Sequence, residues 1–525
     1  MKMMRYRIFI FLLAFVFVSC EDFLDIEQQA VFQDDNYFRN QETATEAIIA
    51  CYDIFQAQWP IHWADVFVIP SDTRSDDVVP GGNPSPNEDE INRNLINDYV
   101  ITADNPLISD MWEFYFAGVW RSNVAIEKIN QIPDSEFSPG AKNRLIAEAR
   151  YLRAFHYSFL VKIYGDLPLV DRTLSPPEYN QPRVDKSIIF DLIKRDTRFA
   201  ITHLNLKANT QKGRATKGAA IHLLANILMY EAGTDASSAN WQQVYNLTDT
   251  LVNGPYSNEY TLLDDFSDIW EEGQDFNEET IFEINFHDNL QIESASFVYW
   301  LSPRFVKDSN GEPLGANGWG NNCPTQDLVD AFETNLDWND PNEWEDPRLS
   351  ASVWREGDIV PTGANDANNV NDPKEVYLDF SPTGYYMKKY MWLNEPENFN
   401  GPINPKVFRF ADVILMHAEA AYYLGDEGQA RESLNKIRER ARHGNNNILP
   451  DITASGQQLI EAIWHERRVE LALESHRFFD LARTGRLVNT MQSKGKSFVE
   501  NKHELLPIPA EELALNPEMT QNPNY

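Results

Sequence analysis

Apolar residues recur at helical spacing through most of the chain, and several such segments follow one another in pairs. In residues 408–424 (FRFADVILMHAEAAYYL) the apolar positions fall on one helix face, and Gly425 and Asp426 then turn the chain. A second amphipathic segment follows at 427–442, with small residues among its apolar positions. Two antiparallel helices of this kind are similar to a tetratricopeptide hairpin. A chain with this pattern is constrained to a helical scaffold.

Six further segments show helical spacing, at 43–58, 110–131, 139–164, 186–205, 215–231 and 240–253. Their sequences do not repeat regularly, so a solenoid made only of such units is not expected. The sequence predicts a mostly α fold, with tetratricopeptide-like helical hairpins as the scaffold.

Between residues 255 and 405 the helical pattern is mostly lost. Gly, Pro, Asn and Asp cluster at 308–324, 337–347, 357–373 and 394–405, whereas ETIFEINF at 279–286 alternates as a strand does. Long loops that carry Trp on a helical scaffold are typical of a recognition surface. We therefore expect one unit, residues 20–525, with three parts: an N-terminal helical part (20–254), a loop-rich ligand-binding part with minor β structure (255–405) and a C-terminal helical part (406–525).

Residues 1–19 have the pattern of a secretion signal. Lys2, Arg5 and Arg7 precede an apolar run of 11 residues, which is too short to cross a hydrocarbon core of about 30 Å. The run ends at Ser19 and Cys20, which resembles a bacterial lipoprotein signal in which cleavage leaves Cys20 to carry the lipid anchor. The alternative is an ordinary secretory signal followed by an incidental cysteine. The sequence thus predicts a signal peptide at 1–19 and lipidation of Cys20.

The chain is strongly acidic, with 80 Asp and Glu against 45 Lys and Arg and a formal charge of −35. Such a charge repels nucleic-acid phosphates, so no nucleic acid is expected as a partner. It also favours a neutral or cationic ligand over a polyanionic one.

Sequence motifs for catalysis or for a metal site are absent. The sequence contains no GxSxG, P-loop, HExxH or CxxC pattern, and its 10 His are scattered. We therefore expect a binding protein rather than an enzyme, with no metal and no cofactor. Apart from Cys20, the only cysteines are Cys51 and Cys323, for which one disulfide and two buried free thiols are both open.

A set of motifs occurs in a fixed order along nearly the whole chain. They are EDFLD at 21–25, SDD at 75–77, EARYLRAFHYSFLVKIYGDLPLV at 148–170, GRATKGAAIHLLANILMY at 213–230, TQDLVDAFE at 325–333, DPRL at 346–349, KKY at 388–390, RFADVILMHAEAAYYLGD at 409–426, LNKIRERA at 434–441, ERRVELALESHRFFDLARTG at 466–485 and HELLPIPAEELALNPEMTQNPNY at 503–525. In these segments the chain resembles the SusD/RagB family of surface-exposed, outer-membrane, glycan-binding lipoproteins. The resemblance implies tetratricopeptide-like hairpins, a ligand site in the irregular part, and a SusC-like TonB-dependent transporter that the lipoprotein covers as a lid.

A glycan site needs flat aromatic faces for the C–H surfaces of sugar rings, and Asn, Asp or Arg for the hydroxyl groups. Trp319 lies in GANGWGNNC (315–323), where Gly and Asn cannot build a core, and its placement is similar to that of the family's ligand-loop aromatic residue. We predict ligand contacts for Trp319 and for the neighbouring Asn317 and Asn321. Trp300, in SFVYWLSPR, is a second candidate, with a core position at a strand end as the alternative.

Further candidates lie before and within the SDD motif at 75–77. Trp59 and Trp63 lie in QAQWPIHWADVF, with packing as the alternative, and the polar candidates in SDTRSDD are Asp72, Arg74 and Asp77, for which turn capping is the alternative. Trp residues on helical stripes are instead assigned to the core: Trp112, Trp120, Trp241, Trp270 and Trp464.

The interleaved Glu and Arg residues of 466–483 have two interpretations, a ligand-binding charge cluster and a salt-bridge network between the last helices; their spacing favours the network. The function that the sequence predicts is capture of an oligo- or polysaccharide, neutral rather than acidic, and its delivery to the transporter. The alternative is a lid of the same family that captures peptides, which would use charged anchors and a groove wall instead of several Trp.

Overall fold

The structure is a computed structural model that describes residues 37–56, 63–82, 85–286, 296–304, 318–335, 343–360, 374–375, 378, 381–390 and 403–525. The predicted signal peptide, Cys20, Trp59 and Asn317 lie outside these ranges, and for Trp63 only the backbone is described. In the part of the chain that the structure covers, no helix has the length and apolarity needed to cross a membrane.

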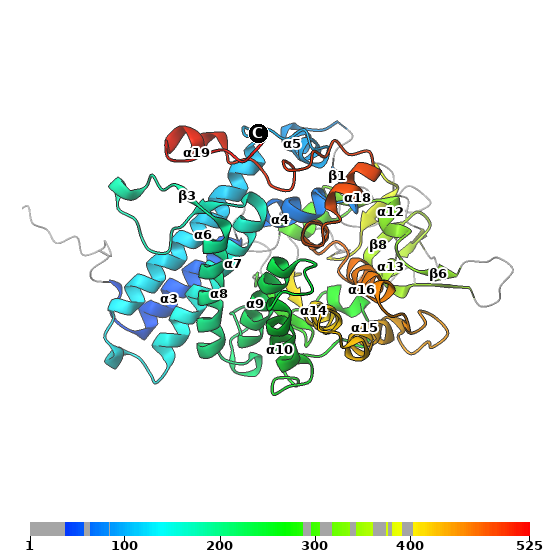
Figure 1. Ribbon diagram of the computed structural model, residues 1–525, viewed down its shortest axis with the longest axis horizontal. Helices are drawn as coiled ribbons and strands as arrows, with labels where there is room; N and C mark the ends of the chain where they lie inside the picture. Colours follow the sequence, from blue (N-terminus) through cyan, green and yellow to red (C-terminus); the bar gives the residue numbers. More distant parts are fainter. Residues whose placement is uncertain are drawn as a thin grey trace, which may run out of the picture.

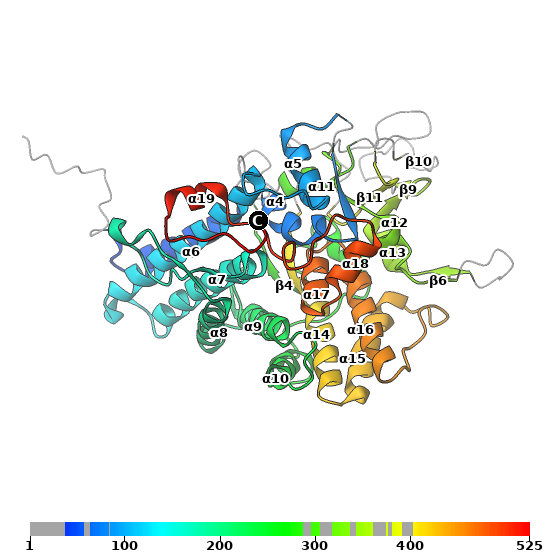
Figure 2. The same ribbon diagram turned by 45° about the horizontal axis from the view of Figure 1, so that its top comes forward.

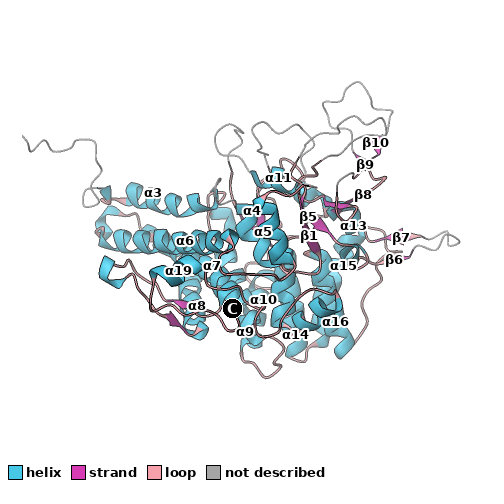
Figure 3. Cartoon of the chain, turned by 90° about the horizontal axis from the view of Figure 1, so that it is seen from above, coloured by secondary structure: helices cyan, strands magenta, loops and turns pink. Residues whose placement is uncertain are grey.

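The scaffold is a row of helices in which each helix packs against the next one along the chain (Figure 1). The row is formed by α6 (Pro106–Gln131), α7 (Ala141–Tyr164), α8 (Lys186–His203), α9 (Lys217–Ala232), α10 (Asn240–Val252), α14 (Phe410–Tyr423), α15 (Glu427–Arg442) and α16 (Gln457–Glu470). A shorter helix, α3 (Gln41–Tyr52), lies beside α6 and α7 (Figure 3). The predicted mostly α fold is confirmed, and α14 and α15 form the hairpin expected from the sequence.

The row continues across the loop-rich part, because α10 packs directly against α14 although more than 150 residues separate them in the chain. Strand β4 (Thr280–Glu283) leaves the row and pairs antiparallel with β12 (Lys406–Arg409), which leads straight into α14. The chain between these two strands therefore leaves the row of helices and returns to it, and we call this segment the excursion.

The excursion and the segments beside it contain short elements. Its helices are α11 (Ser296–Leu301), α12 (Gln326–Val329) and α13 (Pro347–Ser352), and its strands are β5 (Asn321–Pro324), β6 (Thr334–Asn335), β7 (Trp344–Glu345), β8 (Val353–Arg355), β9 (Ile359–Val360), β10 (Lys374–Glu375) and β11 (Tyr385–Met387). The remaining elements are α4 (Trp63–Val68), the π-helical turn η3 (Ile69–Thr73), β1 (Val78–Gly81), α5 (Glu88–Asn97), β2 (Leu167–Pro168), β3 (Arg183–Val184), α17 (Arg477–Arg483), α18 (Leu487–Ser493) and α19 (Ala510–Leu515). Each sheet among the described residues has two strands.

Four of the five Trp residues that the sequence assigns to the core are buried, but Trp120 is 59% exposed on α6. The core-facing side of α6 passes through Tyr115, Val119 and Ile126. One further residue rotates a side chain by about 100° around the helix axis, which carries Trp120 away from that side. Its assignment to the core is therefore wrong.

The two cysteines beyond the N-terminal region are both buried free thiols, which decides between the two open alternatives. Cys51 lies on α3 and Cys323 on β5. Burial raises the pKa of each thiol to about 12, so neither is a reactive thiolate at neutral pH.

Residues 503–525, which we call the C-terminal strap, run back from α18 across the N-terminal helices to α19 and beyond (Figures 1 and 2). The backbone N–H of Leu506 donates to the Ile163 carbonyl at 2.8 Å, and that of Ala510 donates to the Ala103 carbonyl at 2.8 Å. The Asn522 amide donates to the Tyr164 carbonyl at 2.9 Å. The strap therefore holds the end of α7 against the rest of the fold.

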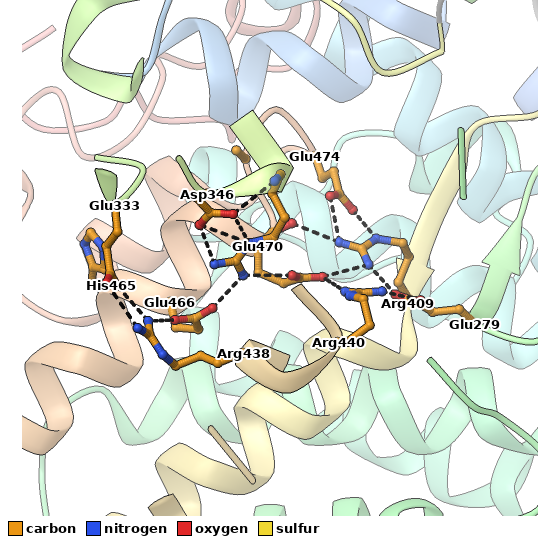
Figure 4. Close-up of polar contacts among 12 residues, drawn as sticks. Glu279, Glu333, Asp346, Arg409, Arg438, Arg440, His465, Glu466, Glu470 and Glu474 are labelled. Carbon is orange, nitrogen blue, oxygen red and sulfur yellow. Dashed lines mark hydrogen bonds and ion pairs between the residues drawn. The ribbon is translucent and has the colours of Figure 1, made fainter. Parts of the chain in front are cut away.

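A buried network of ion pairs anchors the excursion to the C-terminal helices (Figure 4). Its carboxylates are Glu279, Glu333, Asp346, Glu466, Glu470 and Glu474, and its cations are Arg348, Lys389, Arg409, Arg438 and Arg440. The central arginines each join several acids: Arg348 contacts Asp346 at 2.7 Å and Glu466 at 2.5 Å. The prediction of a salt-bridge network in 466–483 is confirmed, and the network also reaches far beyond that segment.

A second charged cluster, on α16 and α17, predicts loss of stability in acid. Burial alone would raise the pKa of Asp480, but Arg467 at 3.3 Å and Arg483 at 2.8 Å outweigh it and hold the pKa at about 2, below the ordinary 3.8. The stability from this carboxylate is present above pH 3.8 and is lost as the pH falls through the folded-state pKa. We expect the free energy of unfolding, measured by urea titration, to decrease by about 2 kcal/mol per such carboxylate between about pH 4 and pH 2.

The Asp480→Asn variant provides the control, because it should lose less stability than the parent over the same pH range. A free energy of unfolding that stays constant from pH 4 to pH 2 would contradict the assignment.

Candidate functional site

The candidate site is centred on Trp319, which precedes β5 and is half-buried. Three consecutive backbone N–H groups hold this segment against the end of α11: Gly318 donates to the Pro303 carbonyl at 2.8 Å, Trp319 to Tyr299 at 3.0 Å and Gly320 to Ser302 at 2.9 Å. The Trp319 backbone is thereby fixed, so its ring is presented in a defined position.

The glycines on either side of Trp319 are required because the backbone of this segment lies very close to α11 and to the residues that follow it. A Cβ atom at Gly318 would lie 2.1 Å from the Ser302 carbonyl oxygen. Gly320 has φ +67°, and a Cβ there would lie 2.9 Å from the Tyr386 ring. The two glycines of the Gly-Trp-Gly sequence therefore allow the backbone to pack closely against α11, which places the Trp319 side chain beside that helix.

The Trp319 ring lies edge-on to the ring of Tyr299, with centroids 5.6 Å apart and planes at 75°. Partial burial raises the pKa of Tyr299, although Arg304 and a hydrogen bond from the Trp319 side chain act in the opposite direction. Tyr299 therefore stays a neutral phenol, and the pair forms a corner of two aromatic faces.

A charged pair adjoins this corner. The Arg304 guanidinium lies 3.6 Å from the Glu90 carboxylate of α5. Arg304 also lies next to Gly320, because a Cβ atom added to that glycine would be 3.2 Å from the Arg304 Cβ. Gly82, which approaches Glu90 closely, donates its backbone N–H to the Gly320 carbonyl at 2.9 Å. Glu90 itself is buried, so the arrangement offers an aromatic corner for stacking on a ring and the Arg304 guanidinium for hydrogen bonds to hydroxyl groups.

Trp300 and Asn321 are also brought to this region, but both face inward. Trp300 is 2% exposed and lies under Arg93, whose guanidinium is 5.5 Å from the ring centroid. Asn321 is completely buried and donates to the Trp300 carbonyl at 3.2 Å. These positions correct the prediction of direct ligand contact, because on α11 the residue that meets Trp319 is Tyr299.

Asp72, Arg74 and Asp77 are buried as well, each at most 2% exposed. Asp77 accepts hydrogen bonds from Arg468 at 2.5 and 2.9 Å. The Arg74 guanidinium lies 3.9 Å from the Phe478 ring centroid and donates to the His503 carbonyl at 2.8 Å. The polar groups of Asp72, Arg74 and Asp77 therefore make contacts inside the protein, and the prediction that these residues touch ligand is corrected too.

Asp72 connects this buried segment to the strand that follows Trp319. It accepts hydrogen bonds from the Asn322 amide at 3.4 Å and from the Ser475 backbone N–H at 3.1 Å. Burial, with the nearby Asp77 charge, raises the pKa of Asp72 to about 7. Asp72, and the Asp77 carbonyl that accepts from the Thr325 N–H at 2.8 Å, therefore connect this segment to the strand that follows Trp319.

Sequence reasoning missed Tyr299, Arg304 and Glu90. Tyr299 and Arg304 lie in the same SFVYWLSPR segment as Trp300, so the sequence indicated this segment but not the side chains in it that lie next to Trp319 and Gly320. Glu90 is the third residue of α5 and forms a capping box with Asn87, a local pattern that does not reveal its contact with Arg304. Across the described ranges, no group of three or more His, Cys, Asp or Glu side chains is placed to hold a metal ion.

Two family models match the chain. A model described as the SusD family matches residues 278–525, and one described as starch-binding, associating with the outer membrane, matches residues 22–229. Together they include both the N-terminal helices and the site around Trp319.

Similar proteins match over almost the full length. The chain is 27% identical to SusD-like protein P25 of Formosa agariphila, with 99% of this chain and 98% of that protein aligned. A solved structure titled a laminarin binding SusD-like protein has a TM-score of 0.74 and 26% identity, and the match covers 93% of this chain and 100% of that one. Surface glycan-binding protein A from Bacteroides thetaiotaomicron, solved in complex with laminarihexaose, shares the fold, with a TM-score of 0.72 and 22% identity over 92% and 99% of the chains.

Proposed function

The chain belongs to the SusD family of glycan-binding proteins, and on this basis we propose that it captures a neutral oligo- or polysaccharide and delivers it to a TonB-dependent outer-membrane transporter. In this proposal Cys20 carries the lipid anchor and the protein faces outward from the outer membrane. A family model described as associating with the outer membrane supports the location.

The observation that carries the proposal is the aromatic corner of Trp319 and Tyr299 with Arg304 and Glu90 beside it. A pyranose ring stacks its C–H face on the Trp319 indole, while Tyr299 borders the ring edge. Arg304 donates hydrogen bonds to sugar hydroxyl groups, and the buried Glu90 carboxylate holds its guanidinium in place. In this proposal the site binds a glycan without cleaving it.

Charge supports a neutral ligand over an acidic one. Arg304, the guanidinium beside the aromatic corner, lies 3.6 Å from a carboxylate, and the chain as a whole carries −35. A polyanionic glycan would gain little from Arg304, whose charge is compensated by Glu90, and would be repelled by the negative charge of the whole protein.

Affinity electrophoresis tests the ligand class. We expect the soluble form that lacks residues 1–20 to be retarded in native gels containing a neutral polysaccharide, with laminarin and starch as first probes. Alginate, a polyanion, should cause no retardation, because the protein and the polymer repel one another.

Two outcomes would contradict the ligand class. Retardation by alginate alone would show that the ligand is acidic. Binding of a peptide mixture in calorimetry, with no retardation by any neutral glycan of an array, would instead show the peptide-capturing alternative.

The transporter is tested separately with the full chain. Detergent-solubilised outer membranes should yield a complex of the lipoprotein with a SusC-like TonB-dependent transporter on affinity purification. Recovery of the lipoprotein alone, under conditions that keep the transporter folded, would contradict the delivery step without affecting glycan binding.

A further inference from the structure

One lysine in the interior of the fold has no counter-charge in contact. Lys162 lies in the last turn of α7 and is 7% exposed. Its ammonium nitrogen faces three aromatic rings, 4.8 Å from the centroid of Phe479, 5.1 Å from Phe159 and 6.0 Å from Tyr230. Within the described ranges, no hydrogen bond or ion pair joins this nitrogen to another residue.

The other charged groups around Lys162 are already paired with one another. Asp480 contacts Arg483 at 2.8 Å and Arg467 at 3.3 Å. Glu474 contacts Arg409 at 2.7 Å and Lys389 at 2.6 Å. The carboxylates near Lys162 are thus neutralised by other cations, and Lys162 keeps an uncompensated positive charge.

That charge persists at neutral pH. Burial lowers the pKa of Lys162 to about 8, while the more distant Asp480 and Asp412 oppose the shift. A group with this pKa is mostly protonated at pH 7. An ammonium ion buried against aromatic rings without a partner is costly, and an opposite charge within a few ångströms removes much of that cost.

A cavity of about 30 Å³ lies beside the ammonium group. This volume accommodates about two water-sized particles, or one halide ion. Ser475 and His476 line the cavity, together with Glu474 and Asp480, whose carboxylates are paired with other cations. The buried Ser475 hydroxyl has no hydrogen-bond partner among the described residues. Burial lowers the pKa of His476, so its neutral imidazole supplies an N–H donor and no second charge.

We propose that this cavity binds a small monovalent anion, chloride in the first instance, between the Lys162 ammonium group and the Ser475 hydroxyl. The anion completes the ion pair that Lys162 lacks, and it fills a space where α7, α9 and α17 meet. It is a structural ligand at a place separate from the aromatic corner at Trp319, so it does not depend on the glycan.

Anion exchange at constant ionic strength tests the proposal on the soluble form. The thermal unfolding midpoint should be about 1–2 °C higher in sodium chloride than in sodium gluconate, because gluconate is too large for the cavity. The difference should saturate with chloride concentration, as expected for one site. In Lys162→Met the two salts should give the same midpoint.

Lys207→Met is the matched control. Lys207 is also a largely buried lysine, but it donates to the Asn277 carbonyl at 2.6 Å and the Thr280 carbonyl at 2.9 Å and does not line this cavity. This variant should keep the chloride effect. Equal midpoints in the two salts for the parent protein, or an equal chloride effect in Lys162→Met, would overturn the proposal.

Crystals of the parent protein soaked in bromide give a test that needs no variant. An anomalous peak in contact with the Lys162 ammonium group is expected. A fully ordered cavity that shows only water, and no anomalous peak, would overturn the proposal even if Lys162→Met fails to fold.

Discussion

The Trp319→Ala variant should lose retardation in the gel that retards the parent protein. Trp319 supplies the largest face of the aromatic corner, and its backbone is fixed by hydrogen bonds from Gly318, Trp319 and Gly320. Truncation of a central aromatic anchor in a binding site costs about 2 kcal/mol or more, which corresponds to a loss of affinity of about thirtyfold. Calorimetry with an oligosaccharide measures the same loss directly.

Trp120→Ala is the control for Trp319→Ala. Trp120 is a more exposed tryptophan, on α6, and it is not part of the site. Its removal should leave retardation unchanged, and both variants should show the far-UV circular dichroism of the parent. Full retardation of Trp319→Ala would remove Trp319 from the ligand site, although the family assignment would stand.

The second large effect concerns the buried network of ion pairs. The Arg409→Met variant should lose about 3–5 kcal/mol of unfolding free energy, because it leaves buried carboxylates without their cation. Arg409 is 1% exposed and contacts Glu279, Glu470 and Glu474. Methionine keeps most of the side-chain length, so the measured loss reports the charge more than the volume. Urea titration followed by tryptophan fluorescence gives the value.

Arg172→Met provides the comparison, because Arg172 forms a bidentate pair with Glu178 on an exposed loop. Its removal should leave the urea midpoint close to that of the parent, since water replaces the lost contacts. Similar midpoints for Arg409→Met and the parent would show that the network does not hold the excursion on the scaffold.

The sequence predicts the scaffold well because each helix is encoded locally. The apolar spacing of 408–424 and 427–442 gives α14 and α15 with bounds that differ by at most two residues. Gly165, with φ +77°, follows the end of α7 at Tyr164, which is also the last residue of the predicted segment 139–164. Packing of α10 against α14 is not visible in such patterns, because it joins segments on either side of the whole excursion.

The site is predicted less well because burial depends on distant partners. Asp77 sits in a polar segment that resembles a surface turn, yet its partner Arg468 lies 391 residues away. The choice of Trp300 over Tyr299 has a similar cause: on a helix of six residues, periodicity is too short to assign the two neighbours to opposite sides. The prediction for Trp319 rests on Gly and Asn neighbours that exclude a core locally, an argument that needs no knowledge of distant partners.

The C-terminal strap has a consequence for how the chain is made. Residues 503–525 are synthesised after all the residues that they contact, and they bond to the Ala103, Ile163 and Tyr164 carbonyls, which belong to the first third of the chain. The packing of these N-terminal segments is therefore complete only once residues 503–525 have been synthesised.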